Sequence, residues 1–201
     1  MIDVSGIGVH EDRRLPHAKR VCEQLFGSAD LVPWYDEWLS RIENPPLQPE
    51  APELDTLILA PSPRSFGLVK ACELLGVRYL GDDTTLVDFA EREPRRGFYW
   101  MWAHNGVNNC RIKPKVCRGT FFNERKQLTL GAWEGIWLYA ADPTCLDYHD
   151  MFLAASVHAE ARDNVAVLLK HKDGTVELTW GWDEAQGDRQ GCATRHGLPL
   201  R

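Results

Sequence analysis

The sequence predicts a mixed α+β domain, and three observations lead to this fold class. The stretch LDTLILA at 54–60 is apolar and short, as buried strands are. Asn-Gly at 105–106 and Asp-Gly at 173–174 each lie beside aromatic and apolar runs, a pattern typical of β-hairpins. The stretch LTLGAWEGIWLYAAD at 128–142 has apolar residues at helical spacing. A βαβ unit plus antiparallel hairpins, in a mixed sheet packed by helices, would contain all three.

Length and composition are those of an ordinary globular protein. The 201 residues suffice for one domain, with 44% hydrophobic and 26% charged residues. No stretch approaches the roughly 18 apolar residues of a membrane span, and the N-terminal MIDVSGIGVHEDRR lacks the basic start and apolar run of a signal peptide. The six cysteines contain no C-x-x-C pair. We therefore expect a soluble cytoplasmic protein with reduced thiols, no membrane association and no zinc or redox motif.

The N-terminal part is predicted to be a helical arm at 1–43. Apolar residues recur at helical spacing over 11–26 and again over 34–42. The stretch NPPLQPEAPE at 44–53 has four prolines in ten residues, which is typical of a linker. The main body would then span 54–201, unless the whole chain forms one domain.

The body begins with the predicted βαβ unit. The buried strand at 54–60 should be followed by a helix at 66–76 and a parallel strand at 77–80, joined by a right-handed crossover. Ser65 is the expected N-cap of that helix. A short helix is expected near 84–91.

The start of that helix is also a candidate anion-binding site. Helix N-termini bind anions through N–H groups, and Arg64 and Ser65 could assist there. Ser65 as an ordinary helix cap is the alternative. Because the preceding turn has two prolines and no G-x-G-x-x-G pattern, we expect no nicotinamide cofactor, and no other cofactor is indicated.

The first predicted hairpin turns at Asn-Gly 105–106. A two-residue type I′ turn would place Trp102 opposite Asn109 and Trp100 opposite Arg111. The second hairpin turns at Asp-Gly 173–174. Its predicted register aligns apolar residues on one face and an opposite-charge pair on the other. That pair is Lys170 with Glu177.

Between the hairpins, residues 128–142 are predicted to form a helix. Its expected buried stripe is Trp133, Ile136, Trp137 and Ala140. Asp142 and Pro143 would be the N-cap and first residue of a following short helix. Residues 186–201 have a turn-like composition without periodicity.

The tryptophan face of the first hairpin is the leading candidate for a binding site. Two indoles flanked by cations and an amide suit cation–π contact, or the stacking of a flat ligand. The alternative is that another layer of the fold covers this face, with the cations extending to solvent at its edge. The predicted ligand-binding residues are Trp100, Trp102, His104, Asn109, Arg111 and Lys113.

The charge of the chain is unevenly distributed. Residues 92–126 contain nine lysines and arginines against two glutamates, a local net charge of +7. Since the whole chain carries −6, the remainder carries −13, which argues against general nucleic-acid binding. Cations interleaved with aromatic residues fit a nucleotide-like or phosphate-like anion. The alternatives are internal neutralisation of the basic segment, or contact with a partner protein or a second copy of the chain.

An enzyme of the Cys/His type, a hydrolase or a transferase, is the rival hypothesis. Its candidate pairs are Cys192 with His196 and His104 with Cys110, each close in sequence. No G-x-S-x-G or other nucleophile signature accompanies them, so inert thiols are the alternative.

A metal site is not predicted. Asp147, His149 and Asp150 are ligand types, with His158 not far away in sequence. However, adjacent positions of a helix do not converge on one point.

The order of motifs from Gly97 onward resembles a bacterial family known only as a domain of unknown function. The stretches that carry the resemblance are GFYW followed by Asn-Gly, LTLGAWEGIWLY, the HDMFL segment that ends at Ser156, and a terminal GCATR. They cover about half of the chain. The resemblance implies a compact bacterial cytoplasmic protein, and it implies no activity.

Overall fold

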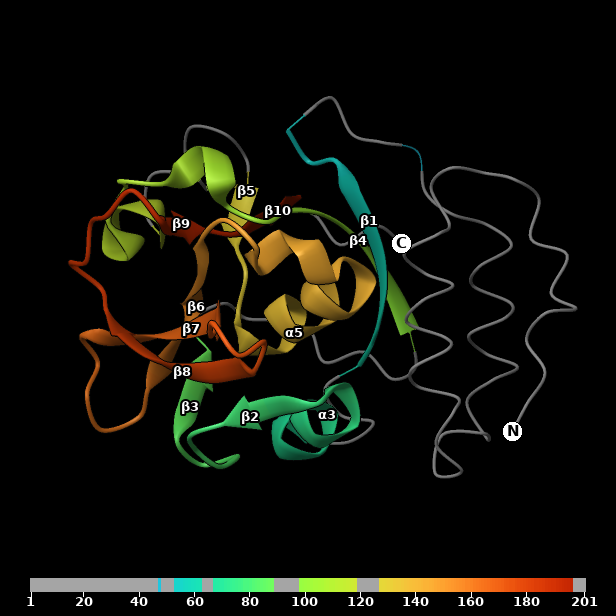
Figure 1. Cartoon of the computed structure of the whole chain (residues 1–201), viewed down its shortest axis with the longest axis horizontal. Helices are drawn as coiled ribbons and strands as arrows, with labels where there is room; N and C mark the ends of the chain where they lie inside the picture. Colours follow the sequence, from blue (N-terminus) through green and yellow to red (C-terminus); the bar gives the residue numbers. More distant parts are fainter. Residues whose placement is uncertain (1–46, 48–52, 63–66, 89–97, 119–126, 197–201) are drawn as a thin grey trace, which may run out of the picture.

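The described part of the chain forms two β-sheets with a buried helix between them. The structure is a computed structural model that describes residue 47 and residues 53–62, 67–88, 98–118 and 127–196 (Figure 1). Helices and strands occur together, in one antiparallel and one mixed sheet, so the predicted α+β class is confirmed. The predicted arm at 1–43 and most of the linker lie outside the described residues.

The smaller sheet has four antiparallel strands in the order β1-β4-β10-β5. In the pairing of β1 with β4, Leu57 lies opposite Trp102 and Leu59 opposite Trp100. Every residue of β1 is buried, as its apolar sequence predicts. The four strands are β1 (Thr56–Pro61), β4 (Phe98–His104), β10 (Thr194–His196) and β5 (Gln127–Thr129).

The larger sheet is mixed and has six strands. Five of them follow the order β2-β8-β7-β6-β3, and β9 pairs in parallel with β6. The pairing of β2 with β8 is also parallel, whereas the remaining pairs are antiparallel. The strands are β2 (Val77–Tyr79), β3 (Leu86–Asp88), β6 (Asp150–His158), β7 (Asn164–Lys170), β8 (Val176–Trp182) and β9 (Gln190–Cys192).

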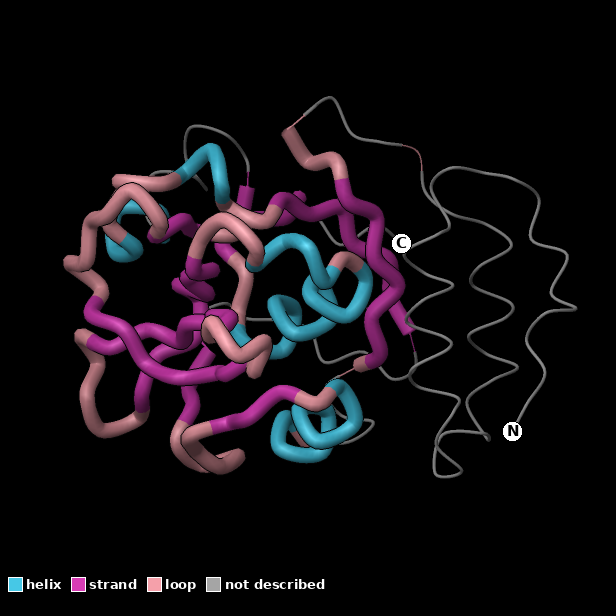
Figure 2. Tube along the Cα trace, in the orientation of Figure 1, coloured by secondary structure: helices cyan, strands magenta, loops and turns pink. Residues whose placement is uncertain are grey.

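Helix α5 (Ala132–Ala141) lies between the two sheets and contacts β1 on one side and β6 and β7 on the other (Figures 1 and 2). The predicted helix is thus confirmed, with Leu128 and Thr129 belonging to β5 instead. All its residues except Tyr139 are buried, because it has sheet on both sides. The Trp133 indole Nε1 donates a hydrogen bond to the Pro61 carbonyl at 2.8 Å and so joins α5 to the smaller sheet.

The predicted βαβ unit is wrong, although its elements exist. Helix α3 (Leu68–Leu75) ends at Gly76, as predicted, and β2 follows it. However, β1 and β2 belong to different sheets, and β1 pairs antiparallel with β4. An apolar run shows only that a strand is buried on both faces, so it cannot identify the partner strand. The N-cap of α3 is Gly67 rather than Ser65, which lies outside the described residues.

The short helix predicted near 84–91 is also wrong over its described part. Thr84 N and Thr85 N both donate hydrogen bonds to Asp82 Oδ1, at 2.8 and 3.0 Å, and form a tight turn. The chain then enters β3, which pairs with β6. The polar turn at 82–85 therefore directs the chain into a sheet instead of starting a helix.

The hairpin predicted at Asn105-Gly106 does not form. Gly106 has the expected positive φ of 96°, but Asn105 has no positive φ, so the turn is not type I′. The chain enters the 3-10 helix η2 (Val107–Asn109) instead. Both edges of β4 are taken by strands distant in sequence, β1 and β10. Long-range pairing overrides the local turn signal here.

The hairpin at Asp173-Gly174 is confirmed, but its register differs from the prediction by one residue. Lys170 lies opposite Val176, and Glu177 lies opposite Leu169. The cause is a three-residue loop at 172–174, which the hydrogen bond from His171 N to Thr175 O closes at 2.8 Å. Only Gly174 takes a positive φ, of 88°, which matches a type I turn followed by a left-handed glycine.

The C-terminal stretch joins the two sheets. Strand β9 belongs to the larger sheet and β10 to the smaller, with Ala193 between them donating its N–H to the Phe152 carbonyl at 3.1 Å. The turn-like composition at 186–201 concealed both strands because each has only three residues. The prediction at Asp142 is confirmed: it caps η3 (Pro143–Leu146) by accepting from Thr144 N at 3.0 Å.

Candidate functional site

The predicted tryptophan platform is not a surface. The exposed fraction is 7% for Trp100 and 3% for Trp102, so neither ring is open to a flat ligand. Without the hairpin, Arg111 does not lie opposite Trp100. The alternative, that other parts of the fold cover these rings, is correct.

Two further predicted ligand-binding residues have structural roles. The Asn109 side chain is buried and donates a hydrogen bond from Nδ2 to the Cys192 carbonyl at 2.9 Å. The buried His104 accepts the Gly106 N–H at Nδ1, at 2.9 Å. Both hold the loop after β4 in place, and neither side chain is presented to solvent.

The described cations of the basic segment pair with acidic residues of the same chain. Arg111 Nε lies 2.6 Å from Asp188 Oδ1, and Lys113 Nζ lies 2.8 Å from Glu184 Oε2. Lys115 also pairs with Glu184, and Arg118 Nη2 lies 2.6 Å from Asp183 Oδ2. Internal neutralisation is thus the arrangement at 111–118, while the basic residues at 92–96 and 125–126 lie outside the described residues.

The N-terminus of α3 is occupied by a carboxylate of the chain. Val69 N donates a hydrogen bond to Asp83 Oδ1 at 3.2 Å, and a Cβ added at Gly67 would lie 2.5 Å from Asp83 Oδ2. Part of the N-terminus at which an external anion is predicted to bind is thus taken by Asp83, and a carboxylate there is favourable to the helix dipole. Arg64 and Ser65, the residues predicted to assist, lie outside the described residues.

The candidate thiols lack the features of a nucleophile. Cys192 is 1% exposed, and its pKa is raised by a hydrogen bond with the Cys117 thiol and by burial. Its other polar contact is the Ile112 carbonyl, so no histidine activates it in the described part of the chain. Burial also raises the pKa of Cys110. His196 pairs through its backbone with Gln127 in the smaller sheet.

Two buried histidines hold the loop at 105–109. His149 Nε2 lies 2.8 Å from the Asn105 carbonyl and must donate to it, whereas His104 Nδ1 must be unprotonated to accept from Gly106. Burial lowers the pKa of both imidazoles. For His104 the charge of His149 lowers the pKa further, and Asp55 opposes this change.

We expect the free energy of unfolding to fall as the pH is lowered from about 7 to about 5. Each histidine has a folded pKa below its ordinary value of 6.5, so the unfolded chain binds more protons in this range. The stabilisation is therefore present above the unfolded pKa and lost as the pH falls through the folded pKa. Asp82, with a pKa of about 2, titrates below this window.

Urea denaturation at a series of pH values measures this dependence. His149→Gln keeps a donor for Asn105 but does not titrate, so it should flatten the dependence. His171→Gln removes a half-exposed histidine and should leave most of the pH dependence in place. Identical pH dependence in His149→Gln and the unmodified protein would contradict the assignment to buried imidazoles.

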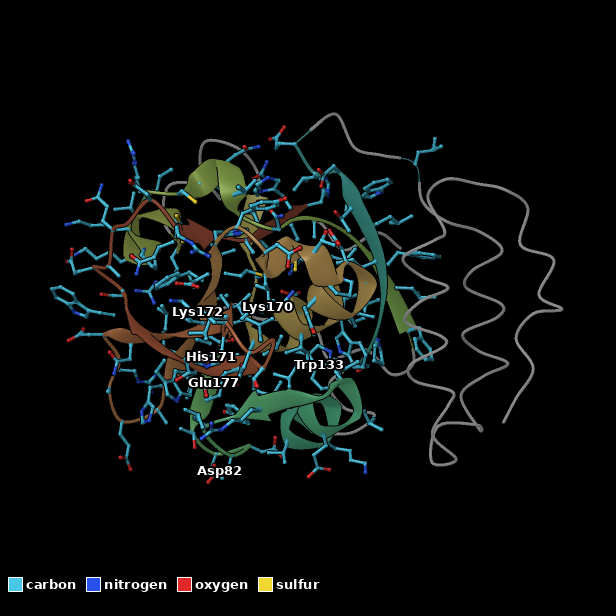
Figure 3. The ribbon with its side chains drawn as sticks, viewed as in Figure 1. Asp82, Trp133, Lys170, His171, Lys172 and Glu177 are labelled. Atoms are coloured by element: carbon cyan, nitrogen blue, oxygen red, sulfur yellow. The ribbon has the colours of Figure 1, made fainter. Side chains whose placement is uncertain are left out.

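A depression of about 580 Å³ lies at the end of the β7–β8 hairpin, beside β2. Figure 3 labels three of its residues, His171, Lys172 and Glu177. The parallel pairing of β2 with β8 places Arg78 opposite Glu177, on the same face of the sheet as His171. The loop at 172–174 forms the rim. The volume of the depression lies in the range of small-molecule sites. The lining residues are Arg78, His171, Lys172, Asp173, Thr175 and Glu177.

The charges of this depression are arranged around Glu177. The Glu177 side chain is 11% exposed, and its Oε2 lies 3.7 Å from Arg78 Nη1 and 3.6 Å from His171 Nε2. The Arg78 and His171 side chains are 64% and 47% exposed, so both reach solvent at the rim. Lys172 makes no ion pair within the described residues. The neighbouring Lys170 forms an ion pair with Asp147, with 2.7 Å between Nζ and Oδ1.

This depression is not among the sites that the sequence predicts. Its residues come from β2 and from a hairpin far along the chain, and only the parallel β2–β8 pairing brings them together. The usable signal is the pair of basic residues, His171 and Lys172, directly before an Asp-Gly turn. The remaining residues could not be found from the sequence, because no local signal indicates that β8 pairs in parallel with β2.

Searches for other functional features and for known relatives add no assignment. Among the described residues, no three His, Cys, Asp or Glu side chains are grouped so that they could hold a metal ion. None of the helices in the described ranges combines the length and apolar character needed to cross a membrane. The resemblance to a bacterial family stays a prediction. Comparisons with protein-family models, curated proteins and solved structures found no match.

Proposed function

We propose that the protein is a binding protein for a small phosphate-like or nucleotide-like anion, and that the ligand binds in the β2–β8 depression. The observation that carries the proposal is the weak pairing of the cations that line this depression with carboxylates. Within the described residues, the ion pair of Arg78 is a contact of 3.7 Å to Glu177, and Lys172 has no ion pair. In contrast, the described cations at 111–118 are each in close contact with a carboxylate.

Cations that lack close partners keep their N–H donors available for a ligand. A guanidinium can bind a phosphate with two parallel hydrogen bonds, and a lysine adds a charge without fixed geometry. Asp173 Oδ1 accepts from Thr175 N at 2.9 Å, so this oxygen is engaged within the turn. The depression therefore offers donors on its exposed side.

Calorimetric titration with inorganic phosphate and with adenosine monophosphate tests the proposal. We expect binding that weakens by at least about tenfold when Arg78→Ala and Lys172→Ala are combined, since two charge-assisted contacts are lost. The matched control combines Lys113→Ala with Lys115→Ala, which changes the net charge equally at the Glu184 cluster. Absence of binding, or an equal loss in the control, would contradict a site in this depression.

The cytoplasmic location and bacterial origin belong to the same proposal and are supported by the resemblance described above. The described contacts do not favour the Cys/His enzyme, because Cys192 is buried, has no histidine partner among the described residues and lies against the Ile112 carbonyl. A protein partner or a second copy remains the alternative role for the basic segment at 92–126.

A further inference from the structure

Glu177 is a nearly buried carboxylate that makes no hydrogen bond with the part of the chain that the structure describes. Its closest nitrogen atoms, on Arg78 and His171, lie 3.7 and 3.6 Å from Oε2, beyond hydrogen-bond distance. Its Oε1 has no polar partner among the described residues. The residue as a whole is 8% exposed, and the exposed part lines the depression.

A carboxylate in this position favours a ligand that donates hydrogen bonds. A charged group removed from water is destabilising unless hydrogen bonds replace its hydration. The Arg78 guanidinium supplies charge but no such bond, and the His171 imidazole makes none either. An N–H group of a ligand could reach Glu177 and satisfy its oxygens, with the added strength of a charge-assisted contact.

Glu177 also opposes a ligand that is only anionic. A phosphate bound to Arg78 and Lys172 would lie near this carboxylate, and like charges at short range repel. A ligand with an ammonium group close to its anionic group removes that repulsion, because the ammonium can lie between the phosphate and Glu177. The cations and the carboxylate of the depression then each face a ligand group of opposite charge.

We infer that the ligand of this depression is zwitterionic and carries a primary ammonium group a few bonds from a phosphate. The anionic group binds Arg78 and Lys172, and the ammonium donates to Glu177. This inference rests on the proposed function and narrows it to aminoalkyl phosphates.

Paired titrations with aminoethyl phosphate and ethyl phosphate test the inference, since the two differ in the ammonium group. We expect the unmodified protein to bind aminoethyl phosphate at least about tenfold more tightly. Glu177→Gln, which keeps the size of the side chain and removes its charge, should reduce this preference to about threefold or less. The control Glu184→Gln removes a carboxylate at the basic segment and should keep the full preference.

The outcomes separate the two proposals. Equal binding of both phosphates by the unmodified protein would overturn the zwitterionic ligand and leave anion binding in place. A preference that persists unchanged in Glu177→Gln would overturn the role of Glu177. Binding of neither probe would overturn the proposed function together with the inference. The comparison within the unmodified protein decides the ligand class even if a variant is unstable.

Discussion

Replacing Glu134 with alanine is expected to lower the free energy of unfolding by about 3–5 kcal/mol. Glu134 lies in the first turn of α5, and its side chain is 4% exposed. Its Oε1 lies 2.8 Å from Arg195 Nε in a close ion pair, and its Oε2 accepts from Gly131 N at 3.2 Å. Because the Arg195 side chain is only 12% exposed, the variant leaves a guanidinium nearly buried without its counter-charge.

Chemical denaturation followed by tryptophan fluorescence measures this loss. The control is Glu184→Ala, which removes a more exposed carboxylate paired with two lysines and should lower the free energy of unfolding by about 1 kcal/mol or less. Similar losses in the two variants would show that the Glu134–Arg195 pair does not join α5 to β10 as described.

Gly106→Ala should destabilise the fold by about 3 kcal/mol or more, from two separate effects. Gly106 has a φ of 96°, in the region that L-residues disfavour. An added Cβ would also lie 2.6 Å from the Cys192 carbonyl carbon and 2.7 Å from Ala193 N. These atoms belong to the backbone that links β9 to β10, so the clash cannot be relieved by rotating a side chain.

Gly174→Ala separates the two effects. Gly174 also has a positive φ, of 88°, but nothing lies within 4 Å of the position of its added Cβ. Its replacement should therefore lower the free energy of unfolding by only about 1–2 kcal/mol. Denaturation curves that show equal losses at both glycines would contradict the close approach of the loop at 105–109 to β9.

The elements predicted correctly from the sequence are those determined by neighbouring residues. Helix α5 follows from apolar spacing, the start of η3 from Asp142 and Pro143, and the hairpin at 173–174 from its Asp-Gly turn. What could not be predicted depends on distant partners. The Asn-Gly at 105–106 has the local chemistry of a hairpin, but β1 and β10 occupy both edges of β4.

The candidate site was less predictable than the fold. Trp100 and Trp102 alternate with other apolar residues along β4, and alternation alone does not show whether the outer face is covered. The cations at 111–118 have partners at 183–188, a pairing that only the tertiary fold creates. The β2–β8 depression depends on a parallel pairing between segments that no local signal connects.

Nuclear magnetic resonance of the full chain, titrated with inorganic phosphate, tests most directly where an anion binds. We expect the backbone amide signals of Arg78, His171 and Lys172 to shift in a saturable way, and those of Arg111 and Lys113 to stay nearly unchanged. Saturable shifts confined to 111–118, with the amides around the β7–β8 hairpin end unaffected, would contradict the account.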